Sequence, residues 1–357
     1  MAIVDGGGSY DYRTLVAGAH RVARELLSGD DDLAEARVAY MITPSFRHVQ
    51  AQWGIWAAGG VAVPLCLSHP PPEIEFVLDD ATPSVVLADT EHLEILRPLT
   101  SSRGLRLVNI DEFGTPDASD GDVAATGRAP ATSDLPQVDA TRRALMIYTS
   151  GTTGRPKGVV TTHANLAVQI TSLVTAWEWV PQDQILLDLP LHHLHGILNV
   201  VCCALWSGAV CEMHPAFDAE TTWDRLAGEG LTLYMAVPTI YRRLIDVWDA
   251  AEPERQQQLT AGAGRLRLMV SGSAALPVPT LERWRELSHH TLLERYGMSE
   301  LGMVLSNPLN GDRRPGSVGL PLPGVEVRLI DDDGTLAAPG TPGEIQVRGE
   351  QVFLEYW

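Results

Sequence analysis

One short segment of the chain concentrates residue types that bind phosphate. Residues 148–158 read Tyr-Thr-Ser-Gly-Thr-Thr-Gly-Arg-Pro-Lys-Gly and directly follow a strand-like run. Glycines let the backbone approach an anion, hydroxyls and amides donate to phosphate oxygens, and Arg and Lys add positive charge. The segment is not a Walker A loop, because the four residues after Gly151 lead to Pro156. The alternative is a flexible surface turn. We predict a phosphate-binding loop, whose ligands are Thr149, Ser150, Gly151, Thr152, Thr153, Gly154 and Lys157.

Three histidines follow another strand-like run. His192, His193 and His195 stand at positions i, i+1 and i+3, which is compatible with a metal site. No matching cluster of carboxylates lies near them in the sequence, and isolated histidines are usually structural. We therefore do not predict a metal at these histidines.

These segments need a scaffold that brings strand ends together. Apolar strand-like runs alternate with helical patterns, which predicts an α/β fold with a mostly parallel sheet. Ligands in such folds sit beyond the carboxyl ends of the strands, so the loops there should face one cleft. From residue 316 onward, short alternating strands predict a small β subdomain. The strand-like runs of the α/β part are 38–42, 60–65, 85–88, 144–148, 184–189, 231–236, 266–270 and 291–293.

The composition restricts the possible partners. The 357 residues are 45% hydrophobic and 20% charged, which is ordinary for a globular protein. A formal net charge of -19 argues against nucleic acid and anionic membranes as partners. None of the four cysteines lies in a CxxC pair, so neither zinc nor a redox motif is supported. Because residues 1–20 lack a signal peptide's apolar run and no stretch could span a bilayer, we predict a cytoplasmic protein.

The segment 148–158 resembles the phosphate-binding loop of the adenylate-forming superfamily, which includes acyl-CoA synthetases, luciferases and nonribosomal peptide adenylation domains. Two more segments agree in order: 271–276 resembles the family's adenine-side loop, and 294–300 resembles its next core motif. The resemblance covers essentially the whole chain. It implies an acyl-CoA synthetase-like N-terminal body, with a large α/β region of two subdomains at 1–315 and the small β subdomain at 316–357.

The resemblance also implies a reaction and its ligands. In this family a carboxylate attacks the α-phosphate of ATP to give an acyl-adenylate and pyrophosphate, and a thiol such as CoA then takes the acyl group. The resemblance implies that Tyr296 stacks on adenine, Ser299 donates to phosphate and Glu300 holds Mg²⁺, which suits each side chain's chemistry. We expect catalytic roles for Ser299, Glu300 and His195. The other nucleotide-binding residues that it implies are Gly272, Ser273, Ala274, Glu294, Gly297 and Met298.

Two arginines and one histidine indicate the acyl substrate. In the family, the segments that carry His195 and Arg243 border the acyl pocket, and Arg295 stands where many relatives have a small or apolar residue. An arginine in a closed pocket is costly unless it meets an anion. We therefore expect Arg243, Arg295 and His195 to hold a second carboxylate, as in malonyl-CoA synthetases, which take malonate or methylmalonate. Alternatively, Arg243 is solvated, and Arg295 pairs with Glu294 or Glu300.

The end of the sequence departs from the family pattern. The chain stops at the apolar and aromatic residues 353–357. The resemblance implies a continuation into a Thr-Gly-Asp segment, a hinge and a small lid domain with a lysine that stabilises the transition state. We expect this C-terminal lid to be absent and turnover to be much impaired. The alternative functions are a monocarboxylate:CoA ligase, a carrier-protein adenylation domain or, from another class, a non-catalytic nucleotide-binding module; the oligomeric state is not predicted.

Overall fold

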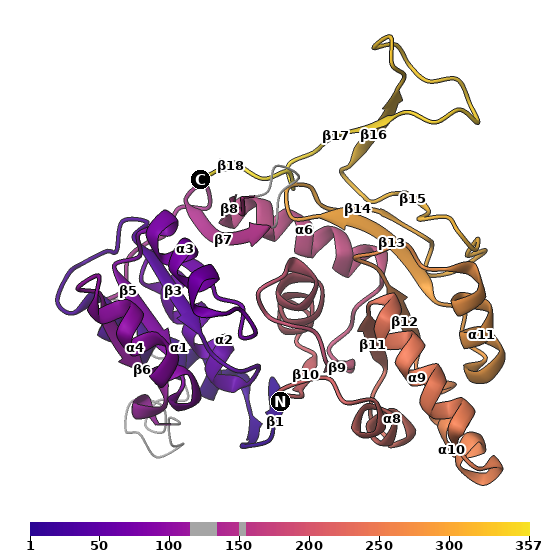
Figure 1. Cartoon of the computed structure of the whole chain (residues 1–357), viewed down its shortest axis with the longest axis horizontal. Coiled ribbons are helices and arrows are strands. Elements are labelled where there is room, and N and C mark those ends of the chain that lie inside the picture. Colours follow the sequence, from indigo (N-terminus) through magenta and orange to yellow (C-terminus); the bar gives the residue numbers. More distant parts are fainter. Residues whose placement is uncertain (115–133, 150–154) are drawn as a thin grey trace.

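The computed structural model describes residues 1–114, 134–149 and 155–357 of the chain. These residues form two lobes, each built around one large sheet (Figure 1). The N-terminal hairpin belongs to the second lobe, because β1 pairs with β10 there. The chain therefore starts in the second lobe, builds the first and returns.

The first lobe contains a sheet of seven strands among the described residues. Its central strands run parallel, whereas β7, β8 and β18 pair antiparallel at one edge. In sheet order the strands are β18 (Glu355–Tyr356), β8 (Lys157–Thr162), β7 (Arg143–Thr149), β4 (Val61–Pro64), β3 (Arg37–Met41), β5 (Val85–Ala88) and β6 (Arg106–Asn109).

Helices cover both faces of the first sheet because its strands are apolar on both sides. Along β3, Val38 and Tyr40 face a core that includes Leu15 of α1 (Tyr12–Leu27). The alternate residue Ala39 faces a second core, which includes residues of α3 and α4. The further helical elements of this lobe are α2 (Phe46–Ala57), α3 (Pro71–Ala81), η1 (Thr90–His92), α4 (Leu93–Ser101) and η2 (Ile110–Phe113).

The second lobe contains a sheet of nine strands in the part of the chain that the structure describes. Strands β9 to β13 pair in parallel, and their carboxyl ends therefore lie at one edge. The order is β15 (Leu320–Pro321), β14 (Gly302–Ser306), β13 (Leu293–Met298), β12 (Leu268–Ser271), β11 (Leu233–Ala236), β9 (Gln184–Leu187), β10 (Val210–Met213), β1 (Ile3–Asp5) and β2 (Gly8–Tyr10).

Local sequence explains where several helices of the second lobe begin. Thr162 and Asn165 form a reciprocal capping box at the start of α6. Proline stands in the first turn of α9, α10 and α11, where its missing N–H costs nothing. The helices are α6 (His163–Ala176), the π-helix η3 (His195–Cys202), α7 (Cys203–Trp206), α8 (Ala219–Ala227), α9 (Pro238–Ala250), α10 (Pro253–Ala263) and α11 (Val278–Ser288).

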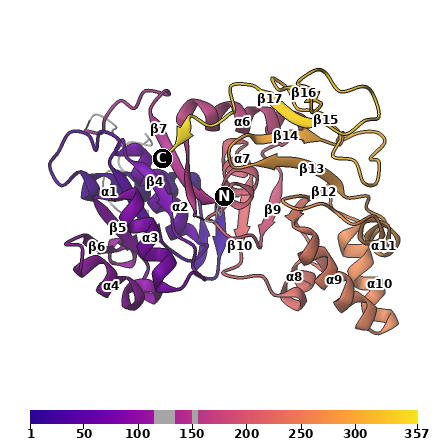
Figure 2. The same cartoon turned by 45° about the horizontal axis from the view of Figure 1, so that its top comes forward.

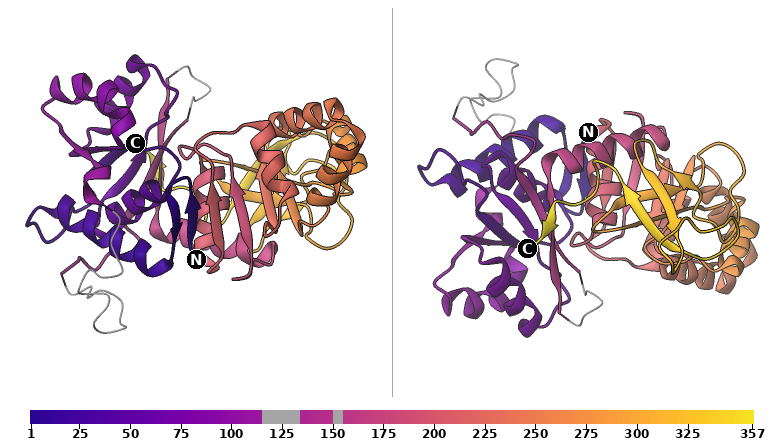
Figure 3. Two further views of the ribbon diagram at one scale, coloured as in Figure 1. Left: turned by 90° about the horizontal axis from the view of Figure 1, so that it is seen from below. Right: turned by 90° about the horizontal axis from the view of Figure 1, so that it is seen from above.

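A two-stranded ribbon, β16 (Glu326–Ile330) with β17 (Glu344–Arg348), lies over the second lobe (Figure 3). Both strands were predicted from the sequence. The small β subdomain was predicted to span 316–357, but its two ends pair elsewhere. Leu320 and Pro321 pair with β14 of the second sheet, and Tyr356 pairs with β8 of the first (Figure 2). Residues 316–357 thus connect both lobes.

The predicted α/β alternation is confirmed. It differs from the structure at strands that form by pairing with residues distant in the sequence. Strands β1, β6, β8, β10 and β14 are among those that were not predicted. The run predicted at 291–293 becomes β13, which extends to Met298 because Arg295 to Met298 pair with β14. Residues 114–137 are rich in Gly, Asp, Pro, Ala, Ser and Thr, which predicts an exposed connection, and they fall largely outside the described residues. Within the described ranges, no helix is both long enough and apolar enough to cross a membrane.

Candidate active site

A cavity of about 600 Å³ lies where the two lobes meet. The first lobe contributes Thr149, Lys157 and Tyr356. The second contributes the residues that follow β9, β11 and β12, together with residues of β13, of the turn after it and of β14. The expectation that these loops face one cleft is therefore confirmed. The lining residues are Thr149, Lys157, Leu189, Pro190, His193, Leu194, His195, Gly196, Val237, Ser273, Arg295, Gly297, Met298, Ser299, Glu300, Met303 and Tyr356.

Arg295 is the buried cation of this cavity. Only 3% of the residue is exposed, and its Nε has no hydrogen-bond partner among the residues that the structure describes. Its Nη2 donates a long hydrogen bond of 3.4 Å to Oγ of Ser273. Burial lowers the pKa of Arg295 to about 9. Among the described residues no carboxylate forms an ion pair with Arg295, so the alternative of an internal pair with Glu294 or Glu300 is not what the structure has.

His195 lies beside this arginine at the start of the π-helix. Its Nδ1 is 3.1 Å from Oγ of Ser273, and its buried Nε2 has no hydrogen-bond partner in the described part of the chain. Burial, followed by the charge of Arg295, holds the pKa of His195 well below its ordinary value. His195 is therefore neutral at pH 7. Ser273 thus joins two of the three side chains that were predicted to hold the substrate carboxylate, His195 and Arg295.

Within the described ranges, neither of the other two histidines of the segment belongs to a group of side chains with metal-ligand spacing. His193 lines the cavity, and its ring centre is 4.1 Å from that of His192. Burial lowers the pKa of His192 to about 3 and also lowers that of His193. Both rings are therefore neutral near pH 7.

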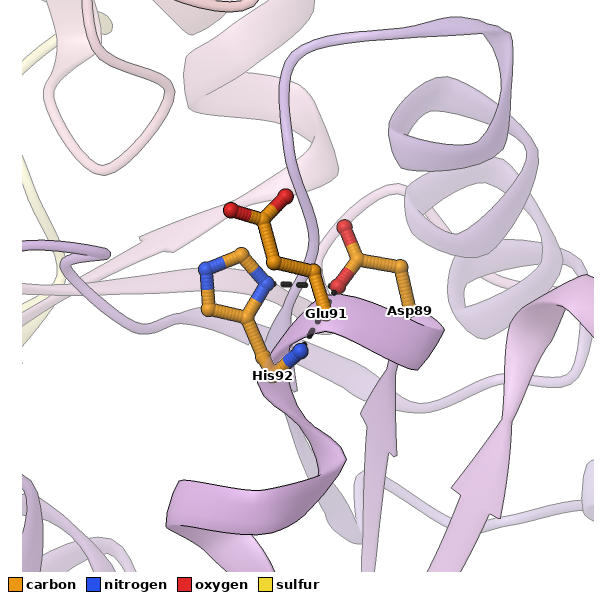
Figure 4. A group of neighbouring side chains, drawn as sticks. All are labelled: Asp89, Glu91 and His92. Carbon is orange, nitrogen blue, oxygen red and sulfur yellow. Dashed lines mark hydrogen bonds and ion pairs between the residues drawn. The ribbon is translucent and has the colours of Figure 1, made fainter.

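The group of side chains with metal-ligand spacing in the described residues lies elsewhere, at Asp89, Glu91 and His92 (Figure 4). Asp89 is already engaged: its Oδ1 is 2.5 Å from Nδ1 of His92, and its Oδ2 accepts the backbone N–H of Thr43. Asp89 also caps η1. We therefore assign this group a role in the loop structure and not in chemistry.

The predicted phosphate side of the site lies around Lys157, Ser299 and Glu300, which all line the cavity. Oε1 of Glu300 accepts a hydrogen bond of 2.9 Å from the phenol of Tyr356. Nζ of Lys157 lies 5.0 Å from the centre of the same Tyr356 ring. Residues Ser150, Gly151, Thr152, Thr153 and Gly154 of the predicted loop lie outside the described residues.

Tyr356 was not predicted as a site residue. It reaches the cavity because β18 pairs with β8, which aligns Tyr356 with Val159. The sequence feature that could have indicated Tyr356 was the aromatic character of residues 353–357, to which no role was assigned.

Several predicted nucleotide-binding residues are not part of the cavity lining. Gly272, Ala274, Glu294 and Tyr296 belong to this group, whereas Ser273, Gly297 and Met298 line the cavity. The carboxylate of Glu294 turns to the protein interior, where its Oε1 accepts the backbone N–H of Leu276 at 3.0 Å. Burial raises its pKa. Glu294 therefore braces the loop that carries Ser273.

Arg243, the other predicted carboxylate ligand, is not brought to Arg295. It lines a second cavity of about 560 Å³, where it is exposed on α9. The two cavities share the wall residues Leu189, Pro190 and Val237. The two predicted cations thus lie in adjoining cavities and not in one.

An Asp-His pair, of which Asp188 is buried and His214 half-buried, also lines the second cavity. The side chain of Asp188 has no exposed surface and accepts hydrogen bonds from Nδ1 of His214 (2.8 Å), Oγ1 of Thr222 (2.9 Å) and the phenol of Tyr234 (3.0 Å). The hydrogen bond to Asp188 raises the pKa of His214.

This raised pKa predicts a pH effect on stability. A group whose pKa is raised by folding stabilises the protein below its unfolded pKa, about 6.5 for His, and loses that contribution as pH rises through the folded value. Between pH 6 and pH 9 we therefore expect the wild type to lose more unfolding free energy than His214→Gln. Urea unfolding at both pH values measures this difference, with the exposed His289→Asn as control. Equal losses in wild type and His214→Gln would contradict the prediction.

Comparison with known proteins places this site in context. The profile of the family described as AMP-binding enzyme matches residues 1–357. The mitochondrial malonate–CoA ligase of Homo sapiens is 43% identical over 388 residues, covering 100% of this chain and 66% of that protein. A malonate–CoA ligase of Arabidopsis thaliana is 36% identical over 389 residues, covering 100% and 62%. The chain therefore spans slightly less than two thirds of these relatives.

Solved structures give the same picture. ATP-bound MatB from Rhodopseudomonas palustris superposes with a TM-score of 0.85 at 34% identity, covering 100% of this chain and 68% of that chain. A malonyl-CoA ligase in a ternary product complex with methylmalonyl-CoA and AMP gives a TM-score of 0.83 at 34% identity, covering 99% and 69%.

Proposed function

Because the chain belongs to the AMP-binding enzyme family, we propose that it activates malonate or methylmalonate with ATP and passes the acyl group to CoA. The observation that carries this substrate class is Arg295, a buried guanidinium with no carboxylate partner in the described residues, on the wall of the cavity. Burying a cation alone is costly, and a substrate anion would offset that cost. A monocarboxylate would leave the cation unpaired.

The proposed reaction has two steps. In the first, an oxygen of one substrate carboxylate attacks the α-phosphorus of ATP, the bond to the bridging oxygen breaks, and pyrophosphate leaves with the electron pair. In the second, the sulfur of CoA attacks the acyl carbon, AMP leaves with the electron pair, and the thiol gives up its proton. The protein contributes mainly orientation and charge neutralisation.

The residues where Thr149 and Lys157 of the first lobe meet Ser299 and Glu300 of the second suit the triphosphate. Lys157 supplies positive charge, and the hydroxyls of Thr149 and Ser299 can donate to phosphate oxygens. Glu300 fits a magnesium ion, because Mg²⁺ prefers carboxylate oxygens and Glu300 lines the cavity. Its Oε1 also accepts a hydrogen bond from Tyr356. Bound Mg²⁺ would supply countercharge to the phosphates.

The residues on the second-lobe side suit the remaining carboxylate of the substrate. Arg295 supplies the charge, and neutral His195 supplies Nε2, which has no partner among the described side chains and backbone. Ser273 contacts both and fixes their separation. We assign the substrate carboxylate to this trio, while Arg243 in the adjoining cavity stays a predicted ligand.

A substrate panel tests the proposal. We expect malonate and methylmalonate, in the presence of ATP and Mg²⁺, to bind more tightly and release more pyrophosphate than acetate or propionate. Isothermal titration accompanies the pyrophosphate assay because turnover of this chain is expected to be low. Equal responses to acetate and malonate would favour a monocarboxylate ligase, an amino-acid response would favour an adenylation domain, and ATP binding without any acid response would favour a non-catalytic module.

The cellular location stays a prediction. The cytoplasmic location expected from the sequence stands beside a human relative that is named mitochondrial. Fractionation of cells that express the native gene would decide between the two compartments.

A further inference from the structure

Gly272 stands directly against the guanidinium of Arg295. A Cβ added at Gly272 would lie 2.4 Å from Nε, 2.5 Å from Cζ and 2.9 Å from Cδ of Arg295. Real Cβ atoms essentially never approach another heavy atom closer than 3.0 Å, so at such a separation a neighbouring atom must shift. Any side chain at position 272 would therefore have to displace Arg295.

The glycine is not required by its own backbone conformation. The φ angle of Gly272 is outside the left-handed region, in contrast to that of the next residue, Ser273, at 68°. An alanine would therefore be allowed at position 272 by backbone sterics alone. Position 272 has no room for a side chain because the side chain of Arg295 fills the space beside it.

Strand register explains why these two residues meet. Strands β12 and β13 pair in parallel with Ser271 opposite Glu294, so Gly272 and Arg295 are the next neighbours as the strands end. Because position 272 has no side chain, Arg295 can lean across the neighbouring strand. In that position its Nη2 reaches Ser273, which in turn contacts His195.

We propose that Gly272 is a positioning residue that sets acyl specificity. Because position 272 has no side chain, Arg295 can occupy the space beside it and point its guanidinium at the substrate carboxylate. The proposal rests on the proposed function, since it needs Arg295 to bind that carboxylate. It differs from the role that the sequence predicted for Gly272, which was contact with adenine. The two roles separate experimentally, because one concerns the acid and the other concerns ATP.

The experiment is a double-mutant cycle of Gly272→Ala and Arg295→Ala. Thermal unfolding is measured for the wild type, both single variants and the double variant. If the added methyl group clashes with Arg295, Gly272→Ala lowers Tm by at least ~2 °C in the wild type and has little effect once Arg295 is truncated. An equal loss of Tm in both backgrounds would overturn the proposed contact.

The same variants are titrated with malonate and, separately, with ATP and Mg²⁺. A displaced guanidinium should weaken malonate binding by roughly a hundredfold and leave ATP binding within about twofold. Gly6→Ala is the matched control, because a Cβ at Gly6 meets no atom within 4 Å and its φ is not left-handed. Weaker ATP binding with unchanged malonate binding would overturn the proposal in favour of the adenine role. Absence of malonate binding in the wild type would instead contradict the proposed function, and the Tm cycle would still decide whether the two residues are coupled.

Discussion

Arg295→Met is expected to lower kcat/KM for malonate by about 30- to 1,000-fold, while kcat/KM for propionate stays the same or rises. The physical reason is the loss of one partner of a desolvated charge pair, which costs roughly 2–4 kcal/mol at a closed site. Methionine keeps much of the side-chain volume, so the cavity should not collapse. Pyrophosphate release at varied malonate and propionate concentrations measures both constants.

The substrate contrast distinguishes a lost carboxylate ligand from general damage. Arg242→Met is the matched control, because Arg242 is exposed on α9, where it pairs with Asp246 at 2.9 Å. It should change neither constant. If Arg295→Met lowered both constants equally, the variant would have harmed the common chemistry, and the assignment of the carboxylate to Arg295 would be incorrect. Arg243→Met in the same assay shows whether the adjoining cavity also contributes.

The second large effect is expected at Glu300. Glu300→Gln should lower the rate of adenylate formation by about 100- to 1,000-fold, because a neutral amide holds Mg²⁺ far less well than a carboxylate. Glutamine keeps the oxygen that accepts from Tyr356, so the variant removes charge with little change of shape. Pyrophosphate release as a function of Mg²⁺ concentration measures the effect.

Magnesium dependence is the informative part of this measurement. We expect Glu300→Gln to need much more Mg²⁺ for half-maximal rate, and excess Mg²⁺ to restore part of the activity. The control is Glu282→Gln on α11, where the side chain is exposed. A rate that fell without any change in Mg²⁺ dependence would show that Glu300 acts in another way. Tyr356→Phe tests the neighbouring hydrogen bond and should have a smaller effect, typical of one neutral donor to a charged group.

The family and the fold class were predicted correctly from the sequence, and the family match and the structural neighbours confirm both. The reason is that the diagnostic features are local. About ten residues of sequence are enough to recognise a dense run of glycines and hydroxyls after a strand, or an apolar run of strand length. The central strands β3, β4 and β5 depend on such runs, and each lies where the sequence placed it.

Strands whose existence depends on a distant partner were less predictable. Residues 295–298 carry no alternating apolar pattern, and they become part of β13 because β14 pairs with them. Tyr356 lies beside Glu300 because β18 pairs with β8, nearly 200 residues earlier. Register between distant strands is set by the packing of the whole sheet, which no short window of sequence contains.

The site divides in the same way. The sequence by itself determined which residue types are available: a cation at 295, a histidine, which can be neutral at pH 7, at 195 and a carboxylate at 300. Only the tertiary structure decided that Arg295 shares a cavity with His195, that Arg243 lies in the adjoining one, and that Glu294 turns inward to Leu276. Side-chain chemistry is a property of single residues, whereas the direction of a side chain depends on neighbours such as Gly272, whose position follows from strand pairing.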